Sequence, residues 1–159
     1  MTKGARLLGA AFATCLAGTF SVSALQAETI APTAVEIVDM EAKSPLTGKA
    51  GDPVAGRDTF ADRKKGNCLA CHANADLGEL LFHGEVGPEL DGVGDRWSTE
   101  QLRAIVINSK QVFGDQTIMP GFYTTALGAR IADKFTDKTI LSAQEVEDVV
   151  AYLLTLKEN

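Results

Sequence analysis

Three stretches of the chain place apolar residues at the spacing of one helix face, and each opens on a residue that can cap a helix. Asp52, followed by a proline in the first turn, opens the first stretch, which we expect to end near Lys65. Capping boxes at Ser98 and Ser142 open the other two, and the second ends near Asn108. The third has a clear apolar face, formed by Val146, Val149, Val150, Leu153 and Leu154. The pattern predicts these helices joined by loops.

The first and last of these helices are expected to cross. Their apolar faces would then bring Tyr152 or Leu153 close to Phe60, which we interpret as a core residue. Residues 73–86 lack a strong period and predict a loop.

The first 27 residues have the pattern of a secretory signal peptide. Lys3 and Arg6 precede an apolar run from Leu7 to Leu25, and cleavage is expected after Ala27. A membrane anchor kept in the mature protein is the alternative, and the polar residues within the run argue against it. Cys15 would leave with this segment.

Residues 28–51 precede the predicted helical domain, residues 52–159, and we interpret them as an extended N-terminal arm. A disordered leader is the alternative. The apolar side chains of Val35, Ile37, Val38 and Met40 favour an arm that packs on something, such as a partner chain.

Charge narrows the possible partners. Without Lys3 and Arg6, the 15 basic residues fall to 13 against 21 acidic ones, a formal net charge of −8. Such a charge disfavours nucleic acid as a partner and suits contact with basic protein surfaces.

The chemistry is concentrated in residues 66–72, which read Gly-Asn-Cys-Leu-Ala-Cys-His. Cys-x-x-Cys-His is the attachment motif of a c-type haem, in which Cys68 and Cys71 bond the porphyrin and His72 becomes an axial iron ligand. A zinc half-site or a redox-active Cys-x-x-Cys would be the alternatives. A zinc site would need a second ligand pair, and a thioredoxin-like motif would need a preceding strand; neither is predicted here.

A second motif is expected to hold the ring of His72 in place. Gly87, Pro88 and Leu90 form a Gly-Pro-x-Leu turn that can present a backbone carbonyl to the Nδ1–H of His72 and so fix its tautomer. Arg96 and Trp97 follow, and both carry N–H donors for a haem propionate. A surface arginine beside a core tryptophan is the equally simple alternative.

The sixth iron ligand is expected to be Met119. It lies in a Pro/Gly loop able to fold over the distal face, whereas Met1 leaves with the signal peptide and Met40 lies in the arm. Met119 could instead be a core residue. His83 is the rival ligand, but it lies close after His72, and we interpret it as a surface or propionate-side histidine.

These motifs together resemble class I c-type cytochromes over residues 52–157, which implies an all-α, class I cytochrome c fold carrying one covalently bound haem c. The chain more closely resembles the SoxX family, the monohaem subunits of the SoxAX cytochromes of bacterial thiosulfate oxidation. The stretches that carry this resemblance are 66–72, 108–114, 119–123, 138–141 and 145–153.

The resemblance implies a periplasmic heterodimer with a SoxA-type cytochrome, and His72 and Met119 as axial ligands. In that complex thiosulfate is oxidatively joined to a cysteine of the SoxYZ carrier, and this subunit would pass the electrons to a soluble cytochrome c. We expect no L-cysteine S-thiosulfotransferase activity from the chain alone, because haem attachment leaves Cys68 and Cys71 without a free thiol. A free-standing shuttle cytochrome, and a haem catalyst or gas sensor with an open distal site, are the alternative functions.

Overall fold

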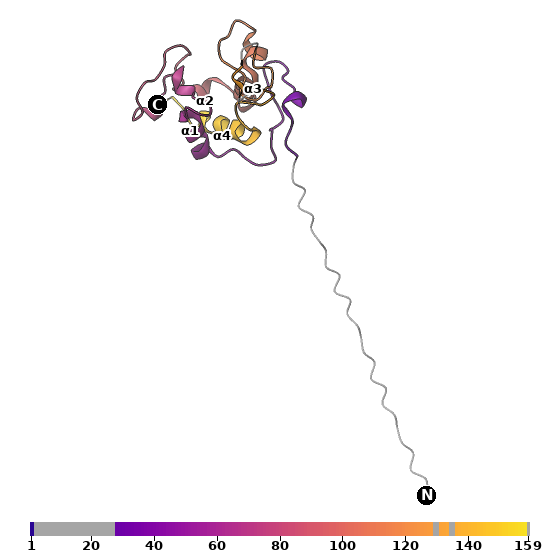
Figure 1. Ribbon diagram of the computed structural model, residues 1–159. Helices are drawn as coiled ribbons and strands as arrows, with labels where there is room; N and C mark the ends of the chain where they lie inside the picture. The colour runs from indigo at the N-terminus through magenta and orange to yellow at the C-terminus, as the bar shows by residue number, and fades with distance from the viewer. Residues whose placement is uncertain (2–27, 129–130, 134–135, 159) are drawn as a thin grey trace.

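The computed structural model describes residues 1, 28–128, 131–133 and 136–158, so the predicted signal peptide falls almost wholly outside it. The helices are α1 (Pro53–Ala61), α2 (Val93–Arg96), α3 (Thr99–Phe113) and α4 (Ala143–Leu153), shown in Figure 1. Short 3-10 turns lie at Pro32–Ala34, Cys68–Ala70 and Ala75–Leu77. These residues form no strand beyond an isolated bridge between Val38 and Glu41, which confirms the all-α prediction. No described helix is both long enough and apolar enough to cross a membrane.

The first and last helices cross as the sequence predicts (Figure 1). Phe60 on α1 meets Tyr152 on α4 edge to face, with ring centroids 5.5 Å apart. The backbones come close because Gly56 lies at the crossing, where a Cβ atom would stand 1.9 Å from the carbonyl oxygen of Asp148. A glycine is therefore required at this crossing.

The helix starts follow the sequence, whereas the ends of α1 and α3 do not. Asp52 caps α1 by accepting a hydrogen bond from the Val54 N–H, and both capping boxes form. However, α1 ends at Ala61 instead of near Lys65. The Asp62 carboxylate accepts a hydrogen bond from the Lys64 N–H, a local turn that competes with helical backbone bonding.

Helix α3 bends at Asn108, the predicted end of the second helix, and then continues to Phe113. Asn108 has φ −155° and ψ 87°, outside the helical region. The helix boundary was therefore predicted too early, because the break is a bend and not a terminus.

The arm packs on its own domain. Leu46 and Ala42 are fully buried, and the Ala42 N–H donates to the Glu100 carbonyl at the start of α3. Of the four apolar arm residues singled out by the sequence, Val35 and Ile37 contact the core, while the side chains of Val38 and Met40 are exposed.

Candidate haem-binding site

The Cys-x-x-Cys-His motif forms a tight 3-10 turn that begins after Asn67, whose φ is +50°. The N–H groups of Cys71 and His72 both donate to the carbonyl of Cys68, at 3.1 and 3.0 Å. This turn holds the two cysteines and the histidine together, and Cys68 and Cys71 are both free thiols.

The His72 ring is held as the Gly-Pro-x-Leu turn predicts. Its Nδ1 lies 2.7 Å from the carbonyl oxygen of Pro88. Since a carbonyl oxygen only accepts, Nδ1 carries the proton and the lone pair of Nε2 is left for a metal. Gly87 makes room for the ring, because a Cβ there would lie 2.3 Å from His72 Cε1.

The Arg96 side chain holds this turn by donating hydrogen bonds to its backbone carbonyls. The guanidinium donates to the carbonyl oxygens of Asp91 and Glu89, at 2.5 and 2.9 Å. Trp97 is half-buried and packs edge to face on Phe113, with centroids 6.2 Å apart. The contact of Arg96 and Trp97 with a haem propionate stays a prediction.

The surroundings of Cys68 argue against a redox-active thiol. Although the residue as a whole is half-buried, burial of the thiol raises its pKa to about 12. Redox-active cysteines instead have a lowered pKa, because the thiolate is the reactive form. A thiol already withdrawn from water suits covalent attachment to an apolar porphyrin edge.

Met119 is positioned by the bend in α3. The carbonyls of Val106 and Ile107, just before the bend, accept hydrogen bonds from the N–H groups of Phe122 and Tyr123, both at 3.1 Å. After the bend, the fully buried Ser109 hydroxyl donates to the Met119 carbonyl at 2.6 Å. These bonds hold the loop at Met119 and just after it, and the half-buried side chain of Met119 packs against the core. The sequence pattern gave no sign of Ser109 beyond its place next to Asn108.

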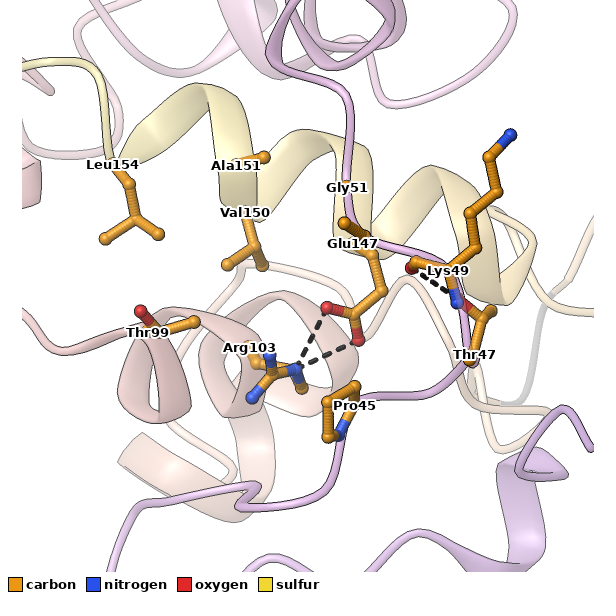
Figure 2. A pocket seen from close by; sticks show the side chains of 12 residues that line it. Pro45, Thr47, Lys49, Gly51, Thr99, Arg103, Glu147, Val150, Ala151 and Leu154 are labelled. Atoms are coloured by element: carbon orange, nitrogen blue, oxygen red, sulfur yellow. Dashed lines mark hydrogen bonds and ion pairs between the residues drawn. The ribbon is translucent and has the colours of Figure 1, made fainter. Parts of the chain in front are cut away.

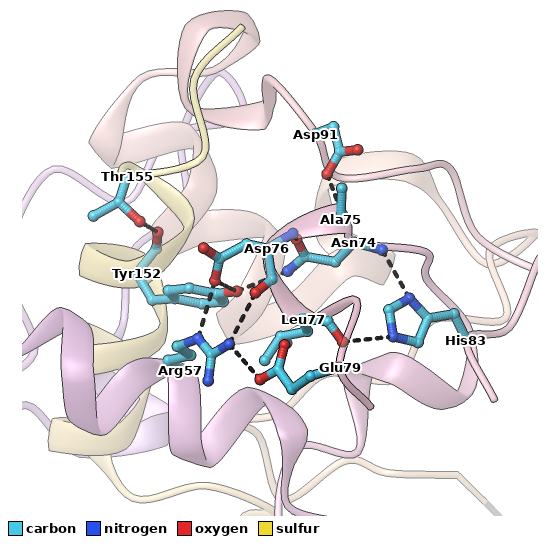
Figure 3. Close-up of polar contacts among 10 residues, drawn as sticks. All are labelled: Arg57, Asn74, Ala75, Asp76, Leu77, Glu79, His83, Asp91, Tyr152 and Thr155. Carbon is cyan, nitrogen blue, oxygen red and sulfur yellow. Dashed lines mark hydrogen bonds and ion pairs between the residues drawn. The ribbon is translucent and has the colours of Figure 1, made fainter. Parts of the chain in front are cut away.

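His83, the rival sixth ligand, has both ring nitrogens engaged with the backbone. Its Nδ1 accepts from the Asn74 N–H at 3.3 Å, and its Nε2 donates to the Leu77 carbonyl at 3.1 Å (Figure 3). These two hydrogen bonds clamp the loop that follows the haem motif. They give His83 a structural role that needs no bond to iron.

A polar cluster joins that loop to α1 and α4, as Figure 3 shows. The Tyr152 hydroxyl donates to Asp76 and accepts from Asn74, each at 2.8 Å. Arg57 of α1 pairs with Asp76 at 3.0 Å and with Glu79 at 2.6 Å. We call these five residues the loop cluster; none of the contacts among them was predicted from the sequence.

A hollow of about 420 Å³ lies elsewhere, between the arm, α3 and α4 (Figure 2). Its buried charged residues, Arg103 and Glu147, pair with each other at 2.9 Å. Because these groups already have partners, the hollow offers no free buried group for a ligand.

The residues at the motif fit a c-type haem. Such a haem needs two thiols for attachment and two iron ligands. The site supplies two free thiols, an imidazole with a free Nε2 and a thioether on a tethered loop. Gly87 leaves the room that the imidazole ring needs. Among the described residues, no group of three or more His, Cys, Asp or Glu side chains is placed to hold another metal ion.

Comparison with known proteins also identifies a c-type cytochrome. The cytochrome c family model matches residues 54–157. A chain in the crystal structure of SoxXA from P. pantotrophus is 42% identical, with a TM-score of 0.76, and the match covers 82% of this chain and 99% of that one. The c-type cytochrome SorU from Sinorhizobium meliloti is 28% identical over 66% of this chain and 90% of its own, with a TM-score of 0.43. No curated protein sequence matches.

Proposed function

This chain belongs to the cytochrome c family and is related to SoxX of the SoxXA complex, and from that premise we propose that it is the electron-transfer subunit of such a complex. The proposal includes cleavage of residues 1–27 as a signal peptide and a periplasmic location. The hydrogen bond between His72 Nδ1 and the Pro88 carbonyl carries the haem part of the proposal, because it prepares Nε2 for iron.

The roles proposed for the site residues follow from their positions. Cys68 and Cys71 would hold haem c through thioether bonds, and His72 and Met119 would ligate its iron. Gly87, Pro88 and Leu90 form the wall behind His72, while Arg96 and Trp97 are the proposed propionate donors. When bound, the haem would take up and release single electrons, and a thioether ligand would raise its reduction potential.

The proposed partner is a SoxA-type cytochrome subunit. Joining thiosulfate to a cysteine of the SoxYZ carrier releases two electrons, and this subunit would pass them one at a time to a soluble cytochrome c. The match to a chain of SoxXA at 42% identity supports this assignment over a free-standing shuttle. We expect no thiosulfate-dependent turnover by the purified single chain.

The optical spectrum of the oxidised holo-protein tests the ligand assignment. We expect the weak red band of a methionine–ferric iron bond, its loss in Met119→Ala, and a lower reduction potential in that variant. Met40→Ala is the matched control, since Met40 is exposed in the arm, and it should keep the band. A wild-type protein without the band, or a Met119→Ala protein that keeps it, would contradict the assignment.

A further inference from the structure

Three consecutive apolar side chains are exposed on the loop that follows the haem motif. Leu80, Leu81 and Phe82, which we call the apolar tip, are 39%, 76% and 81% exposed. A cluster of large apolar side chains on the surface usually marks a site of protein contact.

The apolar tip is held rigidly. Just before it, Leu77 is fully buried and its carbonyl accepts a bond from the Leu80 N–H at 2.9 Å. Just after it, His83 is clamped by both ring nitrogens, and the Gly84 N–H donates to the Leu69 carbonyl at 2.7 Å. Phe82 has φ +69°, a left-handed conformation that is unfavourable for a bulky residue. Such a conformation persists only where neighbouring contacts enforce it, and it is commonest at functional sites.

All the charged residues of the loop that carries the apolar tip are acidic, although Arg57 and Arg96 reach this loop from other segments. Residues 73–90 contain four carboxylates, Asp76, Glu79, Glu85 and Glu89, and no lysine or arginine. Arg57 neutralises the first two, while Glu85 and Glu89 form no ion pair with any described residue. The surface therefore combines an apolar centre with a negative edge, and its complement is an apolar hollow with a basic rim.

We propose that the apolar tip, with Glu85 and Glu89 beside it, is the docking surface for the SoxA-type subunit; this inference rests on the function proposed above. The loop is tied to the haem motif by the bonds from Gly84 to Leu69 and from Gly87 to Cys71. A partner bound there lies beside the segment that holds the haem, as electron transfer between the two subunits requires.

The arm offers the alternative surface. Its turn exposes Val38 and Met40, 59% and 38% exposed, but the residues around this turn carry both signs of charge, including Lys43. We therefore assign the partner to the apolar tip, and the arm turn supplies a matched control of two exposed apolar residues.

The experiment compares the holo-protein with Leu81→Ser/Phe82→Ser and with Val38→Ser/Met40→Ser, each titrated with the SoxA-type subunit of the same organism. We expect the first variant to lose at least about 50-fold in affinity, because two large apolar side chains no longer reach the partner. The control should change by less than about threefold. Glu85→Gln/Glu89→Gln should slow association and weaken its salt dependence.

Every other outcome contradicts either this inference alone or both the inference and the proposed function. If the wild type does not bind the subunit, the proposed function and this inference both fail. If the wild type binds and the tip variant binds equally well, or if only the arm variant loses affinity, the inference alone fails. If the tip variant keeps the heterodimer but loses electron transfer to a soluble cytochrome c, the surface serves the acceptor and the inference is wrong. An unchanged haem spectrum in each variant confirms that the fold is intact.

Discussion

Two polar clusters fasten helix α4 to the segments on either side of it, and water reaches them to very different degrees. Towards the arm, Glu147 pairs with Arg103, and each side chain is 6% exposed. We call this pair, with its bonds to the arm backbone, the arm cluster. Towards the haem loop, Tyr152 anchors the loop cluster, in which the Arg57 and Asp76 side chains are 37% and 48% exposed.

The two clusters therefore differ in how much stability is lost when one of their members is removed. In the arm cluster, Glu147 also accepts from the Leu46 N–H at 2.8 Å, and Arg103 donates to the Ala42 carbonyl at 2.9 Å. A buried pair adds little net stability over an apolar pair, but removing one member leaves a buried charge unpaired. In the loop cluster, the bonds of Arg57, Asp76 and Glu79 are partly open to water and therefore worth less, and only the bond between Asn74 and Tyr152 is buried. The arm therefore depends strongly on one buried ion pair, whereas the haem loop is held by several bonds of which none is a buried ion pair.

The largest effect is expected for Glu147→Gln. It removes the charge that Arg103 needs and should lower the free energy of unfolding of the holo-protein by about 3–5 kcal/mol, measured by denaturant titration. Protease cleavage within residues 28–46 should rise in parallel as the arm is released. Glu36→Gln, at an exposed arm carboxylate, is the control and should change stability by less than about 0.5 kcal/mol. A loss below about 1 kcal/mol for Glu147→Gln would mean that the arm does not depend on this pair.

A smaller effect is expected for Tyr152→Phe. The ring contact with Phe60 is kept, but the amide of Asn74, which is 1% exposed, loses its partner. Leaving a buried donor unsatisfied costs about 1–3 kcal/mol. Tyr123→Phe is the comparison on the arm side, where the hydroxyl donates only to the Ile30 carbonyl at 2.7 Å, so it should cost less. The reverse order in denaturant titrations would contradict this ranking of the two tyrosine hydroxyls.

Much of this molecule could be predicted from local sequence signals. Asp52, Ser98 and Ser142 located the helix starts, because caps are encoded within four residues. The spacing from Cys68 to Pro88 gave the His72–Pro88 hydrogen bond, because both partners belong to short motifs. The contact of Phe60 with Tyr152 followed from the two apolar helix faces.

The remaining contacts join residues far apart in the chain and carry no local signal. Arg103 and Glu147 are ordinary charged residues in helical sequences, and nothing in their neighbourhood shows that they meet the backbone at Ala42 and Leu46. The same holds for Ser109, whose role depends on a bend in α3 that the sequence presented as a helix end.

The smallest effect is expected from the pH dependence of the loop cluster. The hydrogen bond from Tyr152, with burial acting against it and Arg57 adding to it, lowers the pKa of Asp76 from its ordinary value of 3.8. A lowered folded-state pKa contributes stability that is present above the unfolded-state value and is lost as the pH falls through the folded-state value. Asp76→Asn removes this contribution, so the stability difference between wild type and variant should be constant near neutral pH and shrink below about pH 4. Denaturant titrations of both holo-proteins across this range measure it, and effects of acid on the haem ligands are common to both and cancel in the difference. Because Asp76 is half exposed, we expect a difference of no more than about 1 kcal/mol near neutral pH. A difference that grows on acidification would mean that folding raises this pKa, and the loop cluster would then resemble a strained contact more than a fastening one.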